Sequence, residues 1–124
     1  GAGKLGRALI SYDGFSRYGL NIVAAFDISS DLIGTEEGGK PIYGMPMLNA
    51  FCEKERVHIG IITVPAAYAQ DAADALVDAG IQAIWNFAPT HLDLPERIIL
   101  KNENMASSLA VLSSMLARSN DQQK

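Results

Sequence analysis

The stretch Gly1-Ala2-Gly3-Lys4-Leu5-Gly6 matches the pattern G-x-G-x-x-G and decides how the rest of the chain is interpreted. Each glycine has a steric role in a loop that leads from a strand into a helix. The first permits a tight turn, the second lets the backbone approach a pyrophosphate, and the third lets the helix pack closely. Free N–H groups of the first helical turn then face the phosphates, aided by the helix dipole. The six residues therefore predict a dinucleotide-binding loop.

A carboxylate stands where the second half of this pattern needs one. Residues 21–27 read Asn-Ile-Val-Ala-Ala-Phe-Asp, a short apolar run typical of a buried parallel strand, and Asp27 ends it. An acid about 20 residues beyond the glycines accepts hydrogen bonds from the ribose hydroxyls, so Asp27 is the candidate ribose ligand. Because a carboxylate repels a 2′-phosphate, the combination predicts NAD(H) rather than NADP(H). An ordinary residue at a strand-ending turn remains the alternative for Asp27.

Strand and helix patterns alternate along the rest of the chain. Apolar runs predict strands at 59–64, 81–85 and 98–101, with a short strand at 41–43 after a loop over 34–40. Helical spacing predicts a first helix that starts near Lys4 and stops at Asp13-Gly14, and later helices over 47–54, 69–80 and 105–116. Such alternation predicts an α/β fold of the Rossmann type, a doubly wound parallel sheet with helices on both faces.

Two strand ends offer walls for a nicotinamide ring. Ligands of parallel sheets bind at the carboxyl ends of the strands. One strand ends in Thr63-Val64-Pro65 and another continues into Asn86-Phe87-Ala88-Pro89. Both segments are short and mainly apolar, which suits such a pocket, although ordinary strand-to-helix turns share this composition. An apolar pocket favours NADH, because burying the positively charged ring of NAD⁺ costs desolvation energy.

Composition limits the other functions. The 124 residues carry a net charge of -4, and the ten basic residues are scattered, so this segment is not expected to grip DNA phosphates. Cys52 is the only cysteine, which indicates a reducing, cytoplasmic setting. No apolar run approaches the roughly 20 residues that cross a membrane. No metal cluster is evident, and neither His58 nor His91 belongs to a catalytic set, so we expect cofactor binding without enzymatic chemistry.

The domain organisation follows from the position of the glycine loop. A buried strand normally precedes such a loop, so we expect residue 1 to be a cut inside a longer protein, with the first strand truncated. Residues 1–103 are expected to form the nucleotide-binding domain, 104–118 a closing helix and 119–124 a frayed polar tail. Apolar residues at helical spacing mark the closing helix, namely Met105, Leu109, Leu112, Met115 and Leu116.

Nearly the whole chain resembles the Rex family of redox-sensing repressors. Asn-Phe-Ala-Pro following a strand that ends in Val-Pro is more specific than the glycine loop. The matching stretches, in order, are residues 1–9, Tyr12, Phe26-Asp27, 62–65, 69–70, 79–81 and 86–89. The resemblance implies a cytoplasmic bacterial homodimer in which an N-terminal winged-helix domain, absent from this chain, binds operator DNA. This domain would bind NADH or NAD⁺, and NADH would release the repressor from DNA.

The resemblance also implies roles for particular residues. The glycines of the loop and Asp27 carry over as cofactor ligands. Tyr12 would lie near the subunit interface and take part in a redox-dependent rearrangement. The closing helix would be swapped onto the partner subunit, where Asn104-Met105 would reach the nicotinamide. An acid followed by an apolar residue is expected at that position, so Asn104 departs from the family pattern and puts a charged relay from Tyr12 in doubt.

Three other interpretations remain open. A fragment of an NAD-dependent dehydrogenase would transfer hydride to a small carbonyl compound. A CoA-binding domain of the succinyl-CoA ligase kind shares the broad fold, although Asp27 speaks against it. A purely structural dimerisation module would bind no nucleotide.

Overall fold

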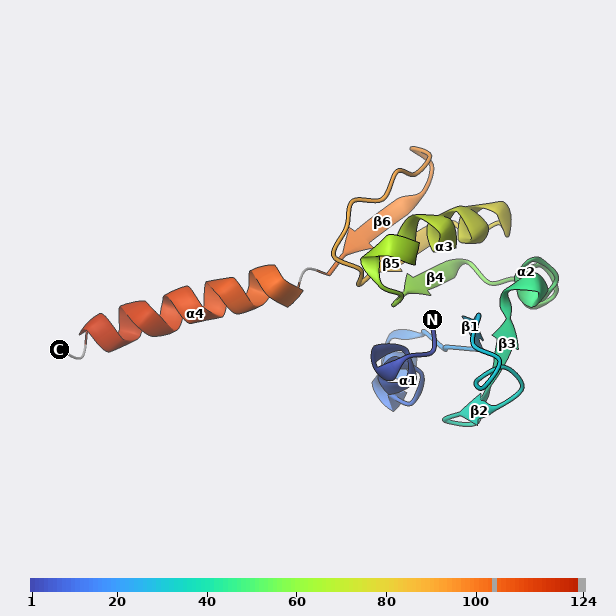
Figure 1. The fold of residues 1–124 in the computed structure, drawn as a ribbon, viewed down its shortest axis with the longest axis horizontal. Helices are drawn as coiled ribbons and strands as arrows, with labels where there is room; N and C mark the ends of the chain where they lie inside the picture. Colours follow the sequence, from blue (N-terminus) through green and yellow to red (C-terminus); the bar gives the residue numbers. More distant parts are fainter. Residues whose placement is uncertain (104, 123–124) are drawn as a thin grey trace.

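The glycines lead directly into a short helix, as predicted. The computed structural model describes residues 1–103 and 105–122. Helix α1 (Lys4–Ile10) begins after Gly3 and ends before Asp13-Gly14, and a 3₁₀ helix that the sequence did not predict, η1 (Asp13–Tyr18), follows it. Helix α1 lies close to the start of the chain (Figure 1).

The first of two sheets follows η1. Strand β1 (Ala25–Asp27) pairs in parallel with β3 (Lys40–Gly44), and β2 (Glu36–Glu37) pairs with β3 in antiparallel fashion. The predicted loop over 34–40 is therefore wrong at β2. Gly38 and Gly39 adopt φ of +58° and +77°, so they close a two-residue hairpin turn between β2 and β3. The strand predicted over 21–27 is confined to its last three residues.

The second sheet carries the predicted parallel pairing. Its strands β4 (Ile59–Ile62), β5 (Ala83–Asn86) and β6 (Ile99–Asn102) lie in that order, all parallel. The predicted strands shift by one or two residues at their ends. This all-parallel sheet and the parallel β1–β3 pair confirm the α/β class. Within the described residues the strands form two separate sheets rather than one continuous sheet.

Two helices contribute four buried residues to the core that covers these strands. After the 3₁₀ helix η2 (Met45–Met47), α2 (Leu48–Glu55) contributes Leu48 and Cys52 to the core. The predicted helix over 47–54 is thus confirmed within one residue at each end.

Helix α3 (Ala66–Asp78) packs Ala69 and Ala73 into the same core and lies over β4 and β5 in Figure 1. A Cβ at Gly60 of β4 would lie 2.7 Å from Leu76 Cδ1, so this glycine permits the close approach of α3. Three acidic residues of this helix, Asp71, Asp74 and Asp78, are exposed.

An apolar groove separates the two sheets. Residues of β1 line one side and residues of β4 the other, and Gly1 and Gly6 form part of its wall. The groove is lined mainly by aliphatic and aromatic side chains, among them Phe15, Phe26, Phe51 and Trp85. Because β1 and β4 share no ladder of hydrogen bonds, each presents an unpaired edge.

The last helix departs from the rest of the domain. Helix α4 (Met105–Gln122) projects away from both sheets (Figure 1). It continues past the predicted end at Arg118, so residues 119–122 are helical instead of forming a frayed tail. Its exposed apolar side chains include Val111, Leu112, Met115 and Leu116.

Candidate cofactor site

The glycine loop is fastened to the end of β4. Thr63 Oγ1 donates a hydrogen bond of 2.7 Å to the carbonyl oxygen of Gly1. A Cβ at Gly1 would lie 2.9 Å from Val64 Cγ1, and a Cβ at Gly6 would overlap the Gly1 carbonyl. The close packing predicted at Gly6 thus involves both the loop itself and Thr63 after β4, whose Oγ1 would lie 3.1 Å from that Cβ. At these two positions the protein's own packing requires glycine.

Gly3 faces open space. A Cβ built at this position would meet no atom within 4 Å, and the residue is exposed. Gly3 is also the N-cap of α1 and offers no side-chain hydrogen bond to the first turn. The backbone N–H groups at the start of α1 therefore have no capping side chain, which is the arrangement a phosphate needs. Lys4 is exposed beside them and Leu5 is half-buried.

Asp27 bonds directly to this loop. Its Oδ2 accepts a hydrogen bond of 2.6 Å from the Ala2 N–H, and its Oδ1 accepts one of 2.8 Å from the Ser29 N–H. Burial alone would raise the pKa of Asp27, but these two hydrogen bonds, the positive amino group of Gly1 and a further backbone hydrogen bond from Ile28 together hold the pKa below its ordinary value. The carboxylate is therefore ionised at neutral pH, and each oxygen keeps capacity for a further donor.

The segment after β5 is held by a buried amide. The Asn86 side chain is 1% exposed; its Oδ1 accepts from the Ala88 N–H at 3.0 Å, and its Nδ2 donates to the Ala88 carbonyl at 3.1 Å. The Phe87 N–H donates to the Ile62 carbonyl at 2.9 Å, which joins this segment to the end of β4. Asn86 and Ala88 are thus buried, whereas Phe87 is half-buried and Pro89 is exposed.

An aromatic row that the sequence did not predict runs along this part of the domain. The ring centroids of Tyr12 and Phe15 lie 4.9 Å apart. Those of Phe15 and Trp85 lie 6.0 Å apart, and those of Trp85 and Phe87 lie 4.7 Å apart. Gly14 leaves room for the Tyr12 ring, since a Cβ there would overlap it, and Tyr12 is 57% exposed at the outer end of the row. The row therefore joins the candidate interface residue to the candidate nicotinamide wall.

The remaining candidate cofactor residues differ in burial and position. Val64 is half-buried against the loop, and Pro65 is the exposed N-cap of α3. Met105 is the first residue of α4, while Asn104 lies outside the described residues. The structure thus brings the glycine loop, Asp27 and the ends of β4 and β5 together, as predicted.

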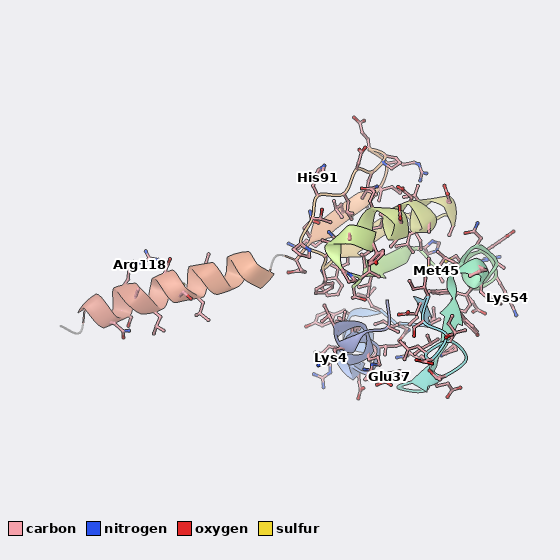
Figure 2. The ribbon with its side chains drawn as sticks, in the orientation of Figure 1. Lys4, Glu37, Met45, Lys54, His91 and Arg118 are labelled. Atoms are coloured by element: carbon pink, nitrogen blue, oxygen red, sulfur yellow. The ribbon has the colours of Figure 1, made fainter. Side chains whose placement is uncertain are left out.

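Two other reactive side chains, Cys52 and His91, do not belong to the glycine loop. Cys52 is buried, and burial raises the pKa of its thiol, which favours a packing role. His91 in the loop after β5 and Lys4 on α1 lie far apart in Figure 2. Within residues 1–103 and 105–122, no group of three His, Cys, Asp or Glu residues is placed to hold a metal ion. None of the helices in the described part is both long and apolar enough to span a bilayer.

A glycine loop that opens a helix, with an acid at the next strand end bonded to it, defines a Rossmann-type dinucleotide-binding domain. Sequence comparison agrees with this class. The family described as CoA binding domain matches residues 1–90. The chain is 43% identical over 112 residues to the redox-sensing transcriptional repressor Rex of Porphyromonas gingivalis, a match that covers 90% of this chain and 51% of that protein. It is 44% identical over 116 residues to Rex of Treponema denticola, covering 94% and 55%.

Solved structures give the same result. The chain superposes on RSP, a Rex-family repressor, with a TM-score of 0.90 at 37% identity, covering 97% of this chain and 57% of that one. The structure of RSP in complex with NADH gives 0.91 at 36% identity, covering 99% and 60%. RSP has also been solved with NAD⁺ and operator DNA, at a TM-score of 0.88 and 36% identity, covering 99% and 57%. The chain belongs to the CoA-binding domain family and is similar to Rex-family repressors, of whose length it spans about half.

Proposed function

We propose that this chain is the NAD(H)-binding sensor domain of a transcriptional repressor that responds to the ratio of NADH to NAD⁺. The observation that carries the proposal is the Ala2–Asp27 hydrogen bond beside the open face of Gly3, which puts a diphosphate cradle and a ribose acceptor together. The NADH and NAD⁺ complexes of RSP support the same ligand here. The names of the relatives support binding without enzymatic chemistry.

In this proposal, the apolar strand ends discriminate between the two redox forms. Four residues of one subunit enclose the nicotinamide, namely Val64, Pro65, Phe87 and Pro89. Met105 of the partner subunit completes the enclosure. Because the ring of NAD⁺ is positive and that of NADH is neutral, an apolar enclosure favours NADH. A ligand shifts the equilibrium between two arrangements of a protein only by the difference in its affinity for them. The preference of the pocket for NADH over NAD⁺ therefore supplies the redox signal. NADH then releases the full-length protein from operator DNA.

The homodimer is part of the same proposal, with α4 exchanged between subunits. Two surfaces support it. Helix α4 exposes an apolar stripe, and on the second sheet Ile59 is 46% exposed and Ile99 71% exposed. Each surface is of the kind that one copy offers to another, because apolar area gains free energy when it leaves water. Tyr12 and the Asn104-Met105 segment would lie at this interface.

The groove between β1 and β4 supports a further strand from a preceding segment. Such a strand would pair with both free edges and fill the apolar space. That segment would connect to an N-terminal winged-helix domain, through which the protein binds operator DNA in the cytoplasm. The net negative charge of the present chain agrees with DNA binding through that other domain and not through this one.

CoA binding is the second candidate, because the matching family bears that name. The ionised Asp27 beside the loop speaks against it, since CoA carries a phosphate on its adenosine ribose and like charges repel. Calorimetric titration of the purified protein with NADH, NAD⁺ and CoA tests both candidates. We expect NADH to bind more tightly than NAD⁺ and both to bind more tightly than CoA. Equal affinity for NADH and NAD⁺, or preference for CoA, would overturn the sensor proposal.

A further inference from the structure

Trp85 is the single tryptophan of the chain. Its indole nitrogen is hydrogen-bonded to a residue outside the strand that carries it. Trp85 lies on β5, half-buried, and its Nε1 donates a hydrogen bond of 3.1 Å to Oε1 of Glu103. Indole has one donor and no acceptor, so this bond uses its full hydrogen-bonding capacity. The bond also removes rotational freedom from the ring, because the indole must keep its N–H directed at the carboxylate.

Glu103 lies in the junction between β6 and α4. Its backbone N–H donates to the Asn86 carbonyl at 2.8 Å, and Asn86 Nδ2 donates to Asn102 Oδ1 at 3.0 Å. Together with the indole bond, these hydrogen bonds fasten the junction to the end of β5. The segment from which α4 departs is therefore held by the same strand that leads into Phe87.

The indole also contacts two aromatic rings, those of Phe87 and Phe15. The ring centroids of Trp85 and Phe87 lie 4.7 Å apart at an interplanar angle of 51°, and Phe15 meets the indole from another direction at 6.0 Å and 84°. Aromatic pairs at these separations have defined preferred geometries, so the orientation of the indole restricts that of the Phe87 ring. The Phe87 N–H is bonded to the Ile62 carbonyl, so the side chain is the part of this residue that keeps freedom.

We propose that Trp85, locked by Glu103, is a positioning residue for the candidate nicotinamide pocket. Its indole sets the Phe87 ring, and its hydrogen bond ties that ring to the junction before α4. This inference rests on the proposed NAD(H) function, because Phe87 has a pocket to line only if the nicotinamide binds there. A cofactor that orders Phe87 also favours one arrangement of the junction, and by linkage the junction influences cofactor affinity equally.

A double-mutant cycle on NADH binding tests this role. The variants are Trp85→Phe, which keeps an aromatic ring and loses the donor, Glu103→Ala, which loses the acceptor, and the double variant. We expect each single change to weaken NADH binding about three- to tenfold, in line with the worth of an oriented aromatic contact. We expect the double variant to bind no more weakly than the worse single variant, because both changes break one link. NADH affinity is measured by calorimetry at a temperature where every variant is folded.

Two controls separate positioning from general stability. Glu103→Gln keeps an oxygen acceptor and should restore most of the NADH affinity, whereas Glu96→Ala, in the exposed loop between β5 and β6, should leave it unchanged. If the losses of NADH affinity multiply in the double variant, the positioning role is overturned. It is also overturned if the melting temperatures fall while NADH affinity is unchanged. Neither outcome contradicts the proposed NAD(H) function. Failure of the unsubstituted protein to bind NADH would overturn the proposed function and this inference with it.

Discussion

The backbone N–H of Ala2 donates a 2.6 Å hydrogen bond to the carboxylate of Asp27. This bond connects the glycine loop to the acid at the next strand end. The sequence identified these two features separately. The acid holds the loop that would bind the diphosphate and keeps capacity for the ribose. Loss of the carboxylate should therefore impair the cofactor site in two ways.

Replacement of Asp27 by alanine is expected to weaken NADH binding by about 1.5–3 kcal/mol, the worth of hydrogen bonds to a charged group. Calorimetric titration measures the change. Asp71→Ala, on the exposed face of α3, is the matched control and should bind NADH as the unsubstituted protein does. Unchanged affinity in the Asp27 variant would remove this residue from the site.

The same carboxylate predicts a pH dependence of stability. Hydrogen bonds hold the pKa of Asp27 below its ordinary value in the folded protein, so the folded state binds its proton less readily than the unfolded state. The stabilisation is present above the ordinary carboxyl pKa and is lost as the pH falls through the lower folded value. Denaturant unfolding from neutral to acidic pH should show a shallower loss of stability in Asp27→Asn than in the unsubstituted protein. Parallel curves for the two proteins would contradict this assignment.

Gly3 and Gly6 should respond differently to alanine. A Cβ at Gly6 would overlap the Gly1 carbonyl, so Gly6→Ala should destabilise the fold by about 1–3 kcal/mol, the usual cost of overpacking. A Cβ at Gly3 meets nothing, so Gly3→Ala should change the free energy of unfolding by only about 0.5 kcal/mol or less. It should nevertheless weaken NADH binding about tenfold or more, because the methyl group would occupy the approach of the pyrophosphate. Normal NADH binding by Gly3→Ala, measured by calorimetry, would place the diphosphate elsewhere.

Thr63 allows a test of how the loop is held. Thr63→Val keeps the shape of the side chain and removes the hydrogen bond to the Gly1 carbonyl, so the fold should lose about 0.5–1.5 kcal/mol. Thr63→Ser keeps the hydroxyl and is the control. Denaturant unfolding compares the two variants, and equal stabilities would mean that the hydroxyl does not hold the loop.

The sequence predicted those features that depend on local pattern. The glycine loop, the apolar run ending at Asp27 and the strand before Thr63 are each contiguous, and each was found near its predicted place. Strand β2 was missed because glutamates are poor strand formers, and only the Gly38-Gly39 turn and the adjacent β3 make them pair. The hydrogen bonds from Thr63 to the glycine loop and from the indole to Glu103 join residues distant in sequence, so no local pattern could reveal them.

The apolar stripe of α4 carries the last prediction, which concerns assembly. Leu112 and Leu116 are exposed on a helix that projects from the domain, and a swapped dimer would bury them against a second copy. Leu116→Glu would place a charge in that contact, where burying it without a partner is costly, so we expect this variant to sediment as a monomer in analytical ultracentrifugation. Ser114→Glu adds the same charge on the exposed helix away from the stripe and should remain dimeric. A dimer that survives Leu116→Glu would mean that the stripe of α4 does not hold the subunits together.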